Sequence, residues 1–177
     1  SLFGREDTIF SDRLNHASII DGILLSQATM KRYPHNDMEA LEEMLKADKE
    51  SKKRAIVTDT VFSMDGDLAP LDKIVKLAKE YDCLVMIDEA HALGVLGEKG
   101  RGLAEHMGLE KAIDIQMGTL SKAAGSFGAY CCGSKNLIDY LINSARSFIY
   151  TTALPANVAA ASIAAIVAAT IAWMAFH

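Results

Sequence analysis

The residues best suited to chemistry follow short apolar segments, at positions where the strands of a sheet would end. Four such segments carry them: His16 comes after Thr8–Ser11, Ser63 after Arg54–Val61, Asp88 and His91 after Cys83–Ile87, and Thr119, Ser121 and Lys122 after Ile113–Met117. In sheets of alternating strands and helices, ligands bind beyond the carboxyl ends of the strands. Four polar strand ends that converge on one edge therefore indicate a ligand site.

Lys122 and Asp88 together favour one kind of ligand. A lysine in a loop of small residues, here Gly118–Gly128, is often only a solvated charge. Pyridoxal phosphate enzymes, however, need a lysine that holds the cofactor aldehyde as a Schiff base. They also need a carboxylate that keeps the pyridine nitrogen protonated, so that the ring can act as an electron sink. Lys122 and Asp88 meet both needs.

The other strand-end groups suit the same cofactor. His16 could stack on its ring, Ser63 and His91 could hydrogen-bond its phenolic oxygen, and Thr119 and Ser121 could hold its phosphate. Backbone amides at the start of a following helix would help with the phosphate. Each residue taken alone has a plainer interpretation: a helix-capping histidine, a turn serine, a histidine in a first helical turn, and hydroxyls that form turns.

Other ligand classes fit the sequence less well. The segment Asp88-Glu89-Ala90-His91 resembles the magnesium-holding box of one helicase class, but the phosphate loop G-x-x-x-x-G-K-[ST] that this function needs is missing. A formal charge of −5 argues against a general nucleic-acid binder. His35, His106 and His177 have no metal-ligand spacing, and we expect them to be solvated or capping residues.

The composition predicts one globular domain with a sizeable core. Of the 177 residues, 50% are hydrophobic and 23% are charged. Three cysteines without metal-ligand spacing favour a reducing, cytoplasmic compartment. The first eleven residues lack the basic start and apolar run of a signal peptide. Because no initiator Met is present, we expect the sequence to begin inside a longer protein.

The elements that must position these residues alternate along the chain. Besides the four segments above, Met30–Tyr33 and Ala129–Cys132 are expected strands. The expected helices are Ile19–Gln27, a helix capped by Asp37 that runs to Ala47, a helix that begins at Pro70, and Leu137–Ser144. This alternation predicts an α/β fold, a three-layer sandwich with a mainly parallel mixed sheet and helices on both faces.

The C-terminal end is strongly apolar. Only Ser162 and Thr170 interrupt the apolar residues between Val158 and Phe176. Nineteen such residues could just span a bilayer. We expect instead a buried, alanine-rich helix and not a membrane span, because alanine contributes little to insertion and basic flanking residues are missing.

Taken together, the motifs resemble the α-oxoamine synthase family of fold-type I pyridoxal phosphate enzymes. Five segments carry the resemblance in the family's order and spacing: S-D-R-L-N-H-A-S-I-I-D-G (11–22), H-N-D (35–37), T-V-F-S-M-D-G-D-L-A-P-L (60–71), M-I-D-E-A-H-A-L-G-V-L-G-E-K-G-R-G (86–102) and G-T-L-S-K-A-A-G (118–125). They cover the chain to about Ala161. The resemblance implies the large cofactor domain of such a transferase, incomplete at both ends.

The resemblance also implies roles for single residues. Lys122 would hold the cofactor aldehyde and move the substrate α-proton, and Asp88 would pair with the pyridine nitrogen. His16 would stack on the ring, while Ser63 and His91 would contact the phenolic oxygen. Thr119 would lie near the phosphate. Thr151 and Thr152 resemble residues that reach the phosphate of the neighbouring subunit, so a homodimer with a shared active site is expected.

The family's reaction joins an amino acid to an acyl-CoA or acyl-carrier-protein thioester, with release of the thiol and, in most members, of carbon dioxide. The segments 60–71 and F-I-Y-T-T-A-L-P (148–155) look most like the branch that uses L-alanine and a pimeloyl thioester for biotin. Glycine C-acetyltransferase is close behind. Three alternatives stay open: an aminotransferase or lyase of the same fold type, an inactive fragment, and a non-catalytic module.

Family members are about twice as long as this chain. The segment that supplies their glycine-rich phosphate turn would lie before Ser1, and their small C-terminal domain would follow. We therefore expect residues 1–155 to be the central part of the cofactor-binding domain, and residues 156–177 to be an apolar helix that leads towards a further domain.

Overall fold

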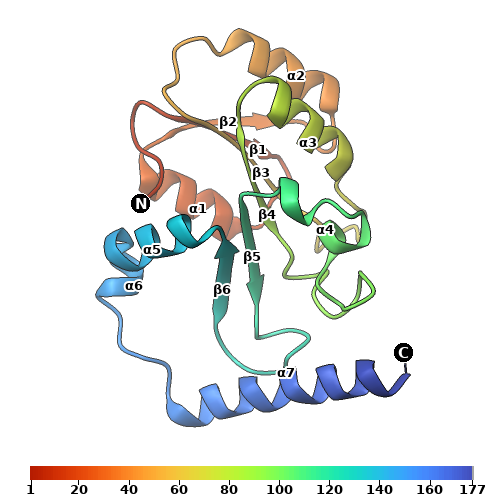
Figure 1. Cartoon of the computed structure of the whole chain (residues 1–177). Helices are drawn as coiled ribbons and strands as arrows, with labels where there is room; N and C mark the ends of the chain where they lie inside the picture. The colour runs from red at the N-terminus through yellow and green to blue at the C-terminus, as the bar shows by residue number, and fades with distance from the viewer. Residues whose placement is uncertain (177) are drawn as a thin grey trace.

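The computed structural model describes residues 1–176, with the side chains of residues 1–170. Its centre is a six-stranded sheet in the order β2-β1-β3-β4-β5-β6 (Figure 1). The strands are β1 (Thr8–Asp12), β2 (Thr29–Tyr33), β3 (Arg54–Asp59), β4 (Leu84–Asp88), β5 (Ile115–Thr119) and β6 (Ala129–Gly133). All neighbours are parallel except β5 and β6. The predicted α/β fold with a mainly parallel mixed sheet is confirmed.

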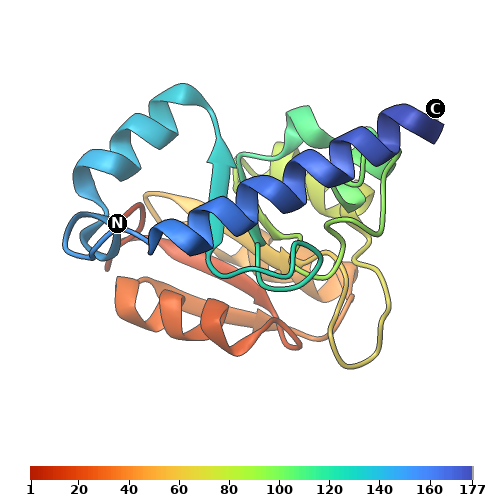
Figure 2. The same ribbon diagram turned by 90° about the horizontal axis from the view of Figure 1, so that it is seen from below.

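Helices cover both faces of this sheet. Helix α1 (Ala17–Ser26) packs on one face, where Ile19 and Ile23 meet Ile9, Ala55 and Val57. Helices α2 (Met38–Ala47) and α3 (Leu71–Glu80) belong to the larger core cluster on the other face (Figure 2). Because successive side chains of a strand point to opposite faces, each central strand contributes to both clusters.

The helices of the larger cluster form where the sequence predicts them. The Asp37 carboxylate accepts the Ala40 N–H at 2.9 Å and caps the start of α2. Helix α3 begins directly after Pro70, and Leu71, Ile74 and Leu77 form its buried stripe. These two helices therefore fix the entry and exit of β3, whose carboxyl end carries part of the site.

The second half of the chain contains shorter elements that the sequence pattern missed. They are α4 (Leu103–His106), the 3₁₀ helix Glu110–Ala112 and α6 (Arg146–Ile149). Helix α5 (Lys135–Ser144) was predicted and begins two residues early. Short elements of three or four residues carry too little periodicity to be recognised from sequence.

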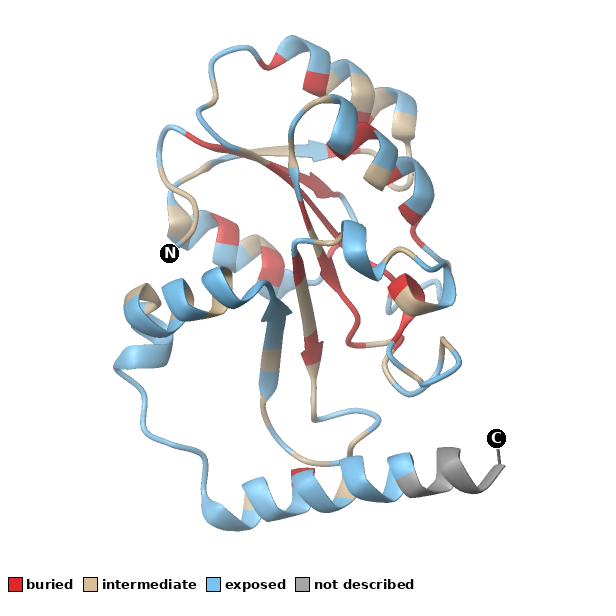
Figure 3. Ribbon diagram, viewed as in Figure 1, coloured by how far each residue is buried: buried red, intermediate tan, exposed pale blue. Residues whose placement is uncertain are grey.

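Helix α7 (Ala156–Phe176) forms as expected, but the expectation that it is buried is wrong. Among its described side chains, Ser162 alone is buried, at 7% exposure, and Ile163 is 63% exposed (Figure 3). The helix lies across the loop between β5 and β6 and away from the sheet, so no layer covers its outer side. Within residues 1–176, the structure contains no helix with the length and hydropathy that a membrane span requires.

Candidate functional site

The strand register brings the polar strand ends together. Asp59 at the end of β3 lies opposite Asp88 at the end of β4, and Asp88 lies opposite Met117 of β5. The loop with Lys122 therefore leaves the same edge of the sheet as the two carboxylates. Asp88 and Lys122 act electrostatically on both Asp59 and His91, and His16 acts on His91, which places these residues in one neighbourhood.

Asp88 is held at the centre of this edge and is only 5% exposed. Its Oδ1 accepts the Ala90 N–H at 2.8 Å. Its carbonyl oxygen accepts both the N–H and the side-chain O–H of Thr60, each at 3.0 Å. Among the described residues, no group donates a hydrogen bond to Oδ2. The carboxylate is thus fixed by one oxygen and has the other available for a ligand.

Asp59 is a site residue that the sequence analysis missed. It is 3% exposed, and its Oδ2 accepts the His16 N–H at 3.1 Å. Burial and the neighbouring Asp88 carboxylate raise the pKa of Asp59 to about 7. The sequence pattern extended this strand to Val61, which hid Asp59 inside it. The observed strand ends at Asp59, so correct strand bounds would have found it.

His16 is placed by its neighbour Asn15. The buried Asn15 amide donates to the Val57 carbonyl at 2.7 Å, and its oxygen accepts the Asp59 N–H at 2.9 Å. These bonds fasten the loop after β1 to the end of β3. His16 itself is exposed, and its Nδ1 accepts the Ser18 N–H at 3.3 Å to cap α1. His16 therefore both caps α1 and lies at the candidate site.

His91 lies in the turn that follows β4 and does not begin a helix. Burial, followed by the charge of Lys122, lowers the pKa of His91, while Asp88 opposes the shift. The turn also packs closely on the Lys122 loop. A Cβ at Gly94 would lie 2.9 Å from the Ala123 Cβ, and Gly94 has a φ of +76° that favours glycine.

The Lys122 loop is closed on itself. Gly128 O accepts the Leu120 N–H at 2.9 Å and the Thr119 O–H at 3.0 Å. The hydroxyls of Thr119 and Ser121 lie 2.7 Å apart. The expected helix after Thr119 is absent, so the expectation of helix-start amides near Ser121 is wrong. The physical reason is that β6 runs antiparallel to β5, so the chain must return at once.

Glu89 is a second buried carboxylate that sequence reasoning missed. It has no exposed surface, and it accepts the Thr60 O–H at 2.6 Å and the N–H groups of Leu103 and Ala104 at 3.0 and 2.9 Å. It therefore caps α4 and joins the end of β3 to the turn after β4. A Cβ at Gly102 would meet its carboxylate at 2.4 Å, so this approach requires glycine.

Two predicted site residues make no hydrogen bond to this group among the described residues. Ser63 is exposed in the turn Phe62–Asp67, which begins three residues after β3 ends. Thr152 is exposed in the segment between α6 and α7, and no described residue forms a hydrogen bond with its side chain. Their predicted roles at the phenolic oxygen and at a neighbouring subunit's phosphate stay predictions.

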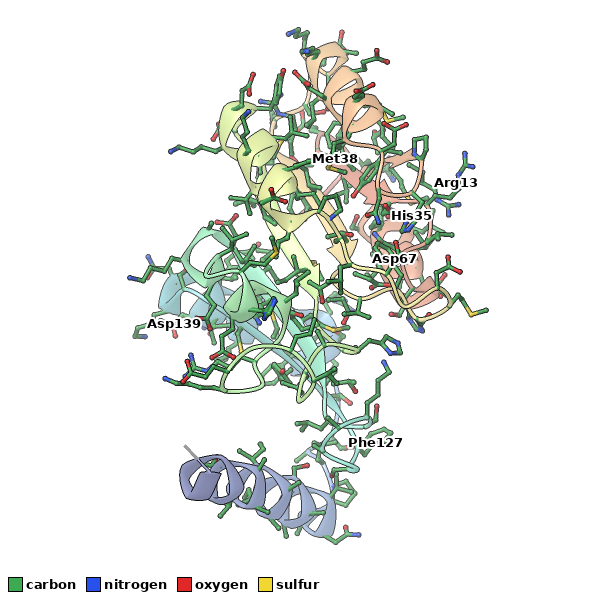
Figure 4. All side chains as sticks on the ribbon, turned by 90° about the vertical axis from the view of Figure 1, so that its right-hand side faces the viewer. Arg13, His35, Met38, Asp67, Phe127 and Asp139 are labelled. Carbon is green, nitrogen blue, oxygen red and sulfur yellow. The ribbon has the colours of Figure 1, made fainter. Side chains whose placement is uncertain are left out.

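The three remaining histidines have different outcomes. The expectation that His35 is solvated or capping is wrong, because its ring lies between Asp12 and Asp67 at 3.0 and 2.7 Å (Figure 4). His106 is exposed as expected. His177 lies outside the described residues. Within residues that the structure describes, no cluster of three or more His, Cys, Asp or Glu side chains could hold a metal ion.

Comparison with known proteins gives concordant results. Residues 1–175 match the family model of class I and II aminotransferases. The 8-amino-7-oxononanoate synthase of Citrifermentans bemidjiense is 61% identical over 94% of this chain. This chain spans 43% of that relative's length.

Solved structures are also similar. A serine palmitoyltransferase variant of S. paucimobilis with a bound PLP–myriocin aldimine has a TM-score of 0.91 and 34% identity, over 95% of this chain and 42% of its own. The 8-amino-7-oxononanoate synthase of Francisella tularensis has a TM-score of 0.82 and 38% identity, over 95% of this chain and 48% of its own.

Proposed function

Since the chain belongs to the class I and II aminotransferase family, and within it to the α-oxoamine synthase type, we propose that it forms the central part of the pyridoxal phosphate site of a C-acyltransferase. One observation carries this proposal. The buried Asp88 carboxylate has a free oxygen at the carboxyl edge of the sheet, in the same neighbourhood as Lys122.

The donor set suits the cofactor. When bound, pyridoxal phosphate supplies an electron sink for negative charge at the substrate α-carbon. Asp88 Oδ2 would accept a hydrogen bond from the pyridine N–H. The Lys122 amine would hold the aldehyde and later carry the proton at the α-carbon. His16 would lie against the ring.

The remaining polar groups would orient the cofactor. The lowered pKa of His91 keeps its ring neutral at pH 7, so one ring nitrogen can donate to the phenolic oxygen. Ser63 would contact the same oxygen. Thr119 and Ser121 would hold phosphate oxygens, and Thr152 would reach the phosphate of a second subunit. These assignments follow the family resemblance and the strand-end placement of the groups.

We assign the substrates to the biotin branch. The proposed reaction condenses L-alanine with a pimeloyl thioester and releases the thiol and carbon dioxide. Identity of 61% to an 8-amino-7-oxononanoate synthase, against 34% to a serine palmitoyltransferase, supports this choice. Glycine C-acetyltransferase is the alternative from the sequence, and thiol release with L-alanine and pimeloyl-CoA, compared with glycine and acetyl-CoA, separates the two.

The cellular and quaternary setting is part of the same proposal. We propose a cytoplasmic homodimer with a shared active site, in which residues 1–155 belong to the cofactor-binding domain. Residues 156–177 would lead towards a further domain.

The test is borohydride reduction in the presence of pyridoxal phosphate, followed by peptide mass mapping. We expect one pyridoxyl adduct, on Lys122, and its loss in Lys122→Arg. Lys111→Arg is the matched control, because Lys111 is an exposed lysine before β5, at the opposite edge of the sheet. Adducts spread over surface lysines, or an unchanged adduct pattern in Lys122→Arg, would refute the proposed site.

A further inference from the structure

His35 is partly buried at the edge of the sheet, and the proposed chemistry does not use it. Its Nδ1 lies 3.0 Å from Asp12 Oδ1, and its Nε2 lies 2.7 Å from Asp67 Oδ2. Ionised carboxylates only accept hydrogen bonds, so both ring nitrogens must carry protons to satisfy both contacts. The geometry therefore calls for a positively charged ring between two negative groups.

Asp12 connects His35 to the loop that carries His16. Asp12 is 1% exposed and ends β1. Its Oδ1 also accepts the Leu14 N–H at 2.8 Å, and its Oδ2 accepts the Asn36 N–H at 2.9 Å. Its carbonyl oxygen accepts the Asn15 N–H. One carboxylate thus shapes the turn before His16 and holds the His35 ring.

Asp67 connects His35 to the turn that carries Ser63. The turn is closed at its base, where the Phe62 N–H donates to the Asp67 carbonyl at 3.1 Å. The His35 ring meets the Phe62 ring edge-on, with centroids 4.4 Å apart. The Asn36 amide donates to Asp67 Oδ2 at 2.9 Å. His35 and Asn36 therefore hold both ends of the turn.

We infer that His35 is a positioning residue, a charged bridge that fixes the Ser63 turn relative to the His16 loop. The importance of this bridge for the reaction rests on the proposed function, in which His16 and Ser63 contact the cofactor. The bridge itself is independent of the cofactor. Figure 4 shows His35 and Asp67 side by side at the edge where β1 and β3 end.

The protonation of His35 should control this bridge. Burial works against the charged ring, but hydrogen bonds and charge from Asp12 and Asp67 outweigh it and raise the pKa of His35. These two carboxylates are the charged groups that act on the ring. Because the pKa of His35 is raised, the bridge is stable at pH values below this pKa, and it is lost as the pH rises through this pKa.

Hydrogen–deuterium exchange of the cofactor-free protein tests the inference. In His35→Gln, we expect residues 12–18 and 61–68 to exchange about tenfold faster, because the amide is uncharged and its two N–H groups share one nitrogen, whereas the ring reaches Asp12 and Asp67 from two nitrogens. Exchange in α3 should not change. His106→Gln is the matched control, since that histidine is exposed. Unchanged protection of both loops in His35→Gln would overturn the inference.

A second variant tests the charge rather than the fold. After correction for intrinsic exchange rates, protection of 61–68 in the parent protein should fall as pH rises, with one midpoint. Asp67→Asn keeps an acceptor for Nε2 but removes a charge that raises the pKa of His35, so we expect the midpoint to move to lower pH. A midpoint that stays in place would contradict the bridge. The lysine adduct is read separately, so failure of the proposed cofactor site would leave this result intact.

Discussion

At the scale of the residue, two buried carboxylates on neighbouring strands set the charge of the site. Asp59 and Asp88 share one register position, and the Asp88 carboxylate helps to raise the pKa of Asp59. Each carboxylate has one oxygen that accepts a backbone N–H, Asp88 Oδ1 from Ala90 and Asp59 Oδ2 from His16. We propose Asp88 as the partner of a cationic ligand because of the family resemblance, and Asp59 as the neighbour that holds the His16 loop.

The first prediction concerns the stability of this pair. The Asp59 pKa is raised from 3.8 to about 7, so between these values the folded protein binds more protons than the unfolded chain. Stability should therefore fall as pH rises through this window. Asp59→Asn keeps an acceptor for the His16 N–H and should raise the free energy of unfolding at pH 8 by about 2 kcal/mol. Urea titrations at pH 4.5, 6 and 8 measure this gain.

The control for Asp59→Asn is a variant that neutralises a carboxylate outside the Asp59–Asp88 pair. Asp65→Asn is suitable because Asp65 is exposed in the turn Phe62–Asp67. It should leave stability nearly unchanged at all three pH values. An equal gain in both variants would show that net charge, and not the Asp59–Asp88 contact, is responsible.

The second prediction concerns cofactor affinity. Asp88→Asn keeps the hydrogen bond from the Ala90 N–H but removes the negative charge beside the free oxygen. We expect affinity for pyridoxal phosphate to fall at least about tenfold, since a charged hydrogen bond contributes roughly 1.5–3 kcal/mol. Fluorescence titration of Asp88→Asn against Asp65→Asn measures the difference, and equal affinities would remove Asp88 from the site.

At the scale of the element, Glu89 joins three segments that are distant in sequence. It connects Thr60 after β3 to Leu103 and Ala104 at the start of α4, and its own N–H donates to Met117 of β5. The turn that carries His91 lies between these fixed points. Element packing therefore positions His91 through a fully buried carboxylate.

The third prediction tests this cap. Glu89→Gln replaces one acceptor oxygen by an amide donor, so the N–H of Leu103 or of Ala104 loses its partner and meets a donor instead. We expect a loss of about 2 kcal/mol in the free energy of unfolding, with faster exchange at Leu103 and Ala104. Glu98→Gln, at an exposed glutamate of the same turn, should cost little. Similar losses in both variants would contradict the capping role.

Sequence reasoning succeeded where local periodicity controls structure. The strands and the helices that flank them follow from short apolar runs and an Asp37 cap, and the strand-end rule found Asp88. It failed where contacts between residues distant in sequence determine the structure. The Asp12 and Asp67 partners of His35 are 23 and 32 residues away, and the exposure of α7 depends on what lies above it. Asp59 was missed through a two-residue error in a strand end.

At the scale of the whole molecule, burial is uneven across the sheet. The core surrounds β1, β3 and β4, whereas most side chains of β6, α5, α6 and the described part of α7 are exposed (Figure 3). Exposed apolar side chains on this side include Phe127, Phe148, Tyr150, Ile163 and Ile166. Exposed apolar side chains that gather into a patch are typical of faces that contact other protein.

The last prediction follows from this asymmetry. Among the residues whose side chains are described, few contacts hold α7 against the loop before β6, one of them the hydrogen bond from the Ser162 hydroxyl to Ser126 Oγ at 2.8 Å. A protein made of these 177 residues should therefore self-associate at micromolar concentration through the α7 side.

Replacing Ile163 and Ile166 together by lysine should weaken association at least about tenfold, because charges resist burial in an apolar interface. Sedimentation velocity across a concentration series measures it. Leu25→Lys provides the control, since Leu25 is 85% exposed on α1, away from this side. If Leu25→Lys weakens association as much as the double variant does, general hydrophobicity and not the α7 face drives it.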